Sequence, residues 1–211
     1  MALLQGNVVG TGLPNLSAGA QNISAGMDRQ SALLVSELNG RYSGLSRAGN
    51  LFFAHAIVTA SVIYSTAAGT GGPLLYNGLG SGVVVQLLAA GFGVTTAATA
   101  AGAVGITGGT GQTVVPTSTT AIDGSGNCFF GGAVSKISAY RVGTVATAGA
   151  FLIPIGDVGT GALTVMDGKL QFVDLGGIIT FGPGGWASLA ASATLTTAVM
   201  TMGLLWAEIP V

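Results

Sequence analysis

A long stretch without formal charge is the feature that most constrains the fold of this chain. Residues 48–122 contain no Asp, Glu, Lys or Arg, and His55 is the one histidine in the chain. Glycine, alanine, threonine and valine fill most of the stretch. Glycine and β-branched residues are poor formers of helix interiors, whereas valine and threonine suit strands. The stretch therefore predicts strands that are buried on both faces.

A membrane span is the alternative for the same region. Residues 83–106 and 189–206 are long and uncharged enough to cross a bilayer as helices. Their composition favours Gly, Ala and Thr over Leu, Ile and Phe, which makes insertion weak, and flanking Lys or Arg is missing. A small membrane pore-former is thus an alternative, and the buried sheet is preferred.

Scarce charge also limits the partners that this chain can attract. Charged residues are 6% of the chain, against about 25% in an average soluble domain. The formal net charge of -1 gives no long-range attraction for nucleic acid or for an anionic bilayer. A surface with so few charges tends to associate, so we expect a homo-oligomer whose subunits bury it.

Local composition divides the chain into an arm and one domain. Residues 1–26 are rich in Gly, Ser and Asn and cannot build a core, which predicts an extended N-terminal arm. The arm has no basic residue before its apolar positions, so we expect no signal peptide and synthesis in the cytoplasm. Residues 27–211 show short apolar runs separated by glycine-rich turns. This pattern predicts an all-β domain, a β-sandwich of jelly-roll type.

The apolar runs predict individual strands. Segment 31–42 could be a short helix or a strand, and the turn signal Asn39-Gly40 favours a strand. Asp167-Gly168 predicts a two-residue hairpin. Residues 99–120 are expected to form a long loop, and residues 123–127 a turn held by Asp and Asn side chains. The remaining expected strands are 50–57, 58–64, 74–76, 82–96, 128–140, 150–155, 163–166, 170–173, 178–181, 186–191 and 199–208.

Residues that carry chemistry are sparse. His55 lies in an apolar run and is expected to be a structural histidine whose hydrogen bonds are satisfied. Cys128, the single cysteine, excludes an intrachain disulfide framework and a multi-cysteine zinc site. The glycine-rich run 105–111 has no lysine after it, and the run from Asp123 has Val134 where a calcium loop needs glutamate. We therefore expect no catalytic residue, no metal and no cofactor, and a protein that is not an enzyme.

The few charges and the two tryptophans are the candidate interface residues. Cations and carboxylates are expected to pair across subunit seams. Trp186 and Trp206 are expected to be core or interface residues, because a large aromatic ring buries much apolar area. The candidate interface consists of Arg29, Glu37, Arg41, Arg47, Trp186 and Trp206.

Four segments resemble small virion proteins of tailed bacteriophages. They are SALLVSELNGRYSGLSRAGNLF, LLYNGLGSGVVVQLLAAGFGV, KISAYRVGTVATAGAFLIPI and PGGWASLAASATLTTAVMTMGLLWAEIP. The resemblance implies a capsid cement or decoration protein, often a trimer, with a β-sandwich and an arm that reaches a neighbour. Its partners would be copies of itself and the major capsid protein, and its place would be the virion. A tail, baseplate or fibre component that binds host glycans is the alternative within the virion.

Overall fold

The structure is a computed structural model, and it describes residues 25–27, 33–35, 42–59, 72–96, 98, 101–159, 171–192, 195 and 197–211. The chain divides into two units, residues 1–41 and residues 42–211. In the first unit, β1 (Ala25–Met27) pairs antiparallel with β2 (Leu33–Val35). The expected strand over residues 31–42 thus contains β2, whereas Tyr42 lies in a turn.

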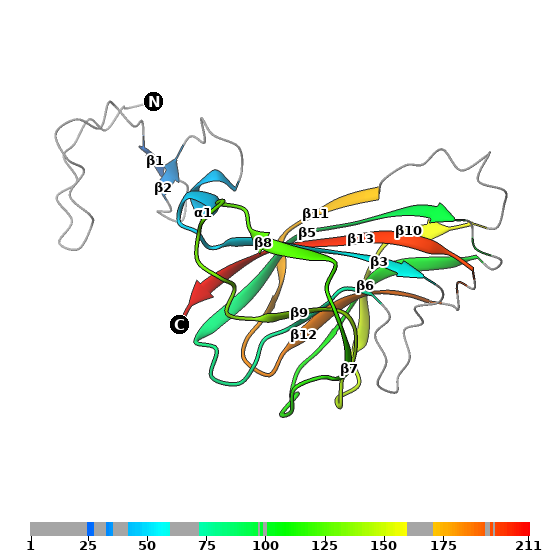
Figure 1. Cartoon of the computed structure of the whole chain (residues 1–211). Coiled ribbons are helices and arrows are strands. Elements are labelled where there is room, and N and C mark those ends of the chain that lie inside the picture. The colour runs from blue at the N-terminus through cyan, green and yellow to red at the C-terminus, as the bar shows by residue number, and fades with distance from the viewer. Residues whose placement is uncertain are drawn as a thin grey trace. The chain divides into compact units, whose positions relative to one another are not determined.

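The second unit is a β-sandwich, as predicted, and its two layers are visible in Figure 1. Among the described residues, one layer is a five-stranded sheet in the order β11 (Gln171–Phe181), β5 (Val83–Thr96), β13 (Val199–Pro210), β3 (Leu51–Thr59), β8 (Gly124–Asn127). The other is a six-stranded sheet in the order β10 (Ala150–Val158), β6 (Gly102–Gly109), β12 (Trp186–Ala191), β4 (Leu74–Tyr76), β9 (Ser138–Thr144), β7 (Thr117–Ala121). Each neighbouring pair is antiparallel. A short helix, α1 (Ser43–Arg47), precedes β3.

The core lies between the sheets and is built by alternation along the strands. In β13, Met200, Met202, Leu204 and Trp206 are buried at every second position. The Trp206 ring stacks on Phe52 of β3 with 5.9 Å between ring centroids. Each such side chain contributes about 1.5–3 kcal/mol by its burial. This alternation with a period of two fixes which face of β13, the central strand of the five-stranded sheet, points into the core.

The uncharged stretch is sheet where the structure describes it. Residues 83–106, one of the two possible membrane spans, form β5 and the first part of β6. The other, residues 189–206, contains the end of β12 and much of β13. No helix within the described ranges has the length and apolarity to cross a bilayer.

The prediction of a long loop over residues 99–120 is wrong, because β6 and the start of β7 lie within it. β6 occupies an interior position between β10 and β12. A Cβ added to Gly105 would overlap the Phe151 ring and the Ile153 carbonyl oxygen. Glycine in this segment therefore allows close approach of strands, a use that its composition does not distinguish from a loop.

Two other assignments are corrected. The expected strands 170–173 and 178–181 are parts of one strand, β11, because Gly176 and Gly177 form a bulge with φ of +56° and +82°. The expected turn 123–127 is largely strand β8, which pairs with Phe52–His55 of β3. In both cases glycine keeps the chain extended or bulged inside a sheet instead of reversing it.

Several expectations stay predictions. The strand 163–166 and the Asp167-Gly168 hairpin lie outside the described residues. The N-terminal arm does as well, apart from its last two residues, which belong to β1. The jelly-roll topology and the domain boundary at residue 26 also remain predictions.

The packing of β6 predicts the effect of adding one methyl group. Gly105→Ala is expected to lower the free energy of unfolding by about 1–3 kcal/mol, because backbone and ring atoms must move. Gly44→Ala in α1 is the control, since a Cβ there meets no described atom within 4 Å. It should be neutral or stabilise by up to about 1 kcal/mol. Urea unfolding measures both, and equal stability of the two variants would contradict the interior position of β6.

Candidate interaction surface

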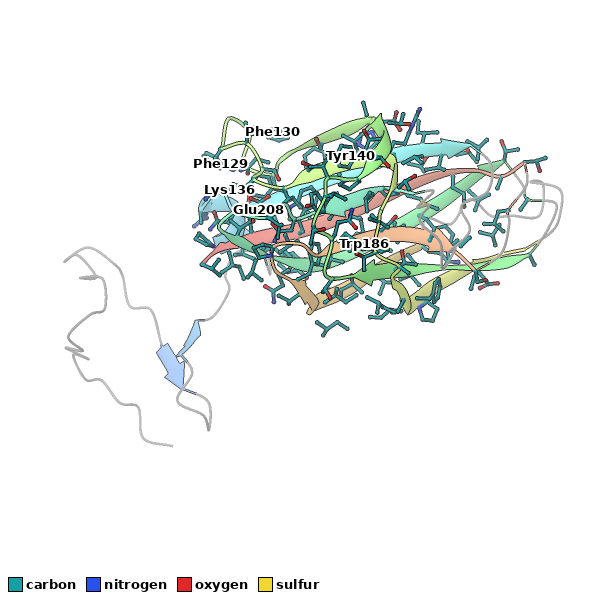
Figure 2. The ribbon with its side chains drawn as sticks, turned by 90° about the horizontal axis from the view of Figure 1, so that it is seen from below. Phe129, Phe130, Lys136, Tyr140, Trp186 and Glu208 are labelled. Atoms are coloured by element: carbon teal, nitrogen blue, oxygen red, sulfur yellow. The ribbon has the colours of Figure 1, made fainter. Side chains whose placement is uncertain are left out.

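An exposed apolar loop joins β8 to β9. We call residues 128–137 the phenylalanine loop. Phe130 is 91% exposed and Val134 is 89% exposed, and Phe129 is also exposed. Figure 2 shows both phenylalanines at one end of the sandwich, near Lys136 and Glu208. Large apolar side chains gathered on one exposed segment are typical of an interaction site.

The Asn127 amide holds the first half of this loop in one conformation. Its Nδ2 donates to the Gly49 carbonyl at 2.7 Å and to the Ala133 carbonyl at 3.0 Å. Its Oδ1 accepts the backbone N–H of Phe129 at 2.8 Å. The Gly132 N–H donates to the Phe129 carbonyl at 2.8 Å, which closes a turn at the tip. The exposed rings therefore stand on a bonded scaffold.

The Glu208 carboxylate holds the second half. Glu208 is 4% exposed and lies on β13, more than seventy positions along the chain from the loop. It accepts the Ser135 hydroxyl, the Lys136 backbone N–H at 2.9 Å and the Trp206 Nε1–H at 3.2 Å. A buried carboxylate is stable only with such donors. Glu208 therefore positions the loop, and both of its carboxylate oxygens accept hydrogen bonds.

A hollow of about 460 Å³ lies beside the loop. Residues 130–135 of the loop form one wall, and Phe53, Ile137, Ala139 and Trp206 contribute apolar surface. Asn127 and Ser135, whose side chains are already hydrogen-bonded, also line it. The hollow suits an apolar side chain of a partner better than a charged ligand.

Cys128 begins the loop and is half-buried. Its backbone N–H donates to the Leu51 carbonyl at 2.8 Å. Burial raises the pKa of the thiol, because desolvation disfavours the thiolate. Cys128 packs against the cluster of Leu51, Leu88 and Ala207, as a small hydrophobic side chain does.

Of the interface residues predicted from the sequence, the three that the structure describes lie in separate places. Arg47 is exposed in the last turn of α1, whereas Arg29, Glu37 and Arg41 lie outside the described residues. Trp186 and Trp206 are buried, so both indole rings pack against residues of the same chain. Trp186 packs in a separate cluster with Leu74, Tyr76, Val145 and Tyr140.

His55 is exposed, although it lies in an apolar run. Alternation in β3 buries Ala54 and Ala56, which turns His55 to the outer face of the sheet. Its ring lies where a Cβ of Gly124 would otherwise be. Among the described residues, no group of three or more His, Cys, Asp or Glu side chains could hold a metal ion.

Sequence reasoning missed the phenylalanine loop because residues 128–140 were expected to form one strand. The strand begins only at Ser138. A signal was present in Phe129-Phe130-Gly131-Gly132, since adjacent large residues cannot both face one side of a strand. The glycine pair that follows is typical of a turn, and Gly131 has φ of +86°.

The bonding of Glu208 predicts a loss of stability in Glu208→Gln. The amide keeps one oxygen but directs an NH₂ group at a donor, which leaves a buried donor without a partner. The free energy of unfolding should fall by about 1–3 kcal/mol in dilute protein. Asp157→Asn, at an exposed position, should change it by less than about 0.5 kcal/mol. Amide exchange in residues 133–137 should accelerate in Glu208→Gln alone, and unchanged protection would contradict its positioning role.

The pKa shift of Cys128 predicts slow alkylation at neutral pH. The thiolate is the reactive form, so a raised pKa moves the rise of the rate to higher pH. The pH of half-maximal labelling by iodoacetamide should lie above the value measured for the same chain in urea. Comparison of half-maximal pH values, instead of absolute rates, separates the pKa effect from shielding. Coincident profiles would show that the folded environment does not desolvate the thiol.

Comparisons of this chain with protein-family models, with curated proteins and with solved structures find no match.

Proposed function

We propose that this chain is a structural virion protein, a capsid cement or decoration protein that packs on the phage shell and on copies of itself. The single observation that carries the proposal is the phenylalanine loop, which presents Phe129, Phe130 and Val134 to solvent on a hydrogen-bonded scaffold. Aromatic residues, phenylalanine among them, are enriched in protein–protein interfaces, where a few well-packed residues dominate the affinity. The resemblance of four segments to virion proteins of tailed phages supports the phage head as the particle that this chain joins.

The energetics of the loop favour association over solitary existence. Burial of one phenylalanine contributes about 1.5–3 kcal/mol, which is tenfold or more in an equilibrium constant. The ordering cost at the interface is small, because the loop backbone is already fixed by Asn127 and Glu208. A preorganised apolar surface of this kind suits a protein that is present in many copies.

A head protein is favoured over a glycan-binding tail component. The glycan alternative depends on an exposed tryptophan, but Trp186 and Trp206 are both buried. The hollow beside the loop is lined mainly by apolar groups, whereas a sugar site needs clustered polar partners. The contacts of the loop support protein–protein packing.

Substitution in the loop tests the proposal. Phe130→Ser should weaken self-association and binding to phage shells by about tenfold or more, since one exposed ring no longer contributes its burial. Val115→Ser is the control, because Val115 is also an exposed apolar residue but lies in the loop between β6 and β7. Sedimentation velocity and co-sedimentation with shells provide the readouts, and the urea midpoint of both variants should match the parent.

Immunogold labelling of virions locates the chain. Label on the head is the expected result, whereas label on the tail would replace the head assignment. A chain that stays monomeric at all concentrations and binds no particle would show that the proposal is wrong.

A further inference from the structure

The described part of the chain carries a second exposed apolar surface, and it differs from the first in charge. We call it the β10–β11 edge. On β11, Phe172 is 64% exposed and Ile178 is 74% exposed, and both point outward from the five-stranded sheet. On β10, Leu152 and Asp157 are exposed.

The two strands of this edge adjoin. A Cβ on Gly156 would overlap the side-chain oxygen of Gln171, so β10 and β11 are in contact at that point. Asp157 and Phe172 are the next residues of the two strands. Because Gly156 and Gln171 face the core, Asp157 and Phe172 point away from it, each on the outer face of its own sheet at this border.

We propose that the phenylalanine loop of one copy docks on the β10–β11 edge of a second copy. This inference rests on the proposed self-association and names its two surfaces. Charge complementarity is the reason for pairing these two surfaces. Arg47, Lys136 and Asp157 are the described charged residues that have neither an ion-pair partner nor a side-chain hydrogen bond within the described ranges, whereas Asp123 pairs with Arg141 at 3.3 Å.

These charges are distributed between the two surfaces. Lys136 belongs to the phenylalanine loop, and Arg47 lies two residues before Gly49, whose carbonyl accepts the Asn127 amide at the base of that loop. Asp157 belongs to the β10–β11 edge. An apolar surface with cations and an apolar surface with a carboxylate are complementary, and such complementarity selects partner and orientation.

The geometry makes the contact head-to-tail. In the described sheet order, β8, which leads directly into the phenylalanine loop, is one edge strand of the five-stranded sheet, and β11 is the other. Docking of one edge on the opposite edge of the next copy uses different patches on the two partners. Repetition of such a contact generates a ring when the rotation closes, so each copy uses both surfaces.

Cross-linking tests the pairing directly. Phe130→Cys and Phe172→Cys are made separately in full-length chains that carry Cys128→Ser, one of them with a mass tag. Under mild oxidation, the mixed disulfide between the two variants should form at least about fivefold faster than either homodisulfide, because the contact is heterologous. Both substituted side chains are exposed, and matching urea midpoints confirm that the fold is kept.

Charge exchange tests the complementarity. Lys136→Glu and Asp157→Lys should each weaken self-association by about threefold to tenfold, and the double variant should recover most of the loss. Independent, additive losses would overturn the proposed pairing.

Three outcomes separate this inference from the proposed function. A faster Phe130→Cys homodisulfide would replace the head-to-tail contact by a two-fold one. Self-association that Phe130→Ser weakens but Lys136→Glu and Asp157→Lys leave unchanged would overturn this inference and leave the proposed function standing. Flotation of a monomer with phosphatidylserine vesicles, lost in Phe130→Ser, would overturn both, because the loop would then bind a lipid surface.

Discussion

The burial of Glu208 links the core of the sandwich to its most exposed loop. The same strand carries Trp206 into the core, where it stacks on Phe52, and Glu208 two positions later, where it accepts hydrogen bonds from Ser135 and Lys136. A buried carboxylate that loses these hydrogen-bond donors is destabilised, so detachment of the loop from the sandwich costs free energy. The exposure of Phe130 therefore depends on a residue that is itself hidden.

Glycine has two structural uses in this chain. At Gly176 and Gly177 it supplies positive φ values that form a bulge in β11. At Gly105 it removes a side chain so that the Phe151 ring can lie against the backbone of an interior strand. The chain has 37 glycines and still forms sheets. Some of these glycines allow strands to approach closely, and others provide the backbone conformations of turns and bulges.

The few charges of the described residues are unevenly distributed over the sandwich. Asp123 and Arg141 neutralise each other beside β8, and Glu208 is enclosed. Among the other described charges, Arg47 and Lys136 lie beside the β8 edge of the five-stranded sheet, and Asp174 lies on β11 at its other edge. Asp157 lies on β10, the adjoining edge strand of the six-stranded sheet. In the proposed self-association, Arg47, Lys136 and Asp157 are the charges that select the partner surface.

Local pattern was sufficient for the strands whose side chains alternate or whose ends carry turn residues. β4 and β12 agree with their predicted limits, and β5 and β13 differ by one or two residues, because period-two burial and turns such as Pro183-Gly184 are local properties. The sandwich class followed from these strands together with the scarcity of charge.

Long-range contacts decided the rest. β6 is a strand because β10 and β12 enclose it, and residues 128–137 are a loop because Asn127 and Glu208 hold them outside the sheet. His55 faces outward because the alanines on either side of it face the core. The first two outcomes depend on partners far along the chain, and sequence order does not specify which distant residues those partners will be.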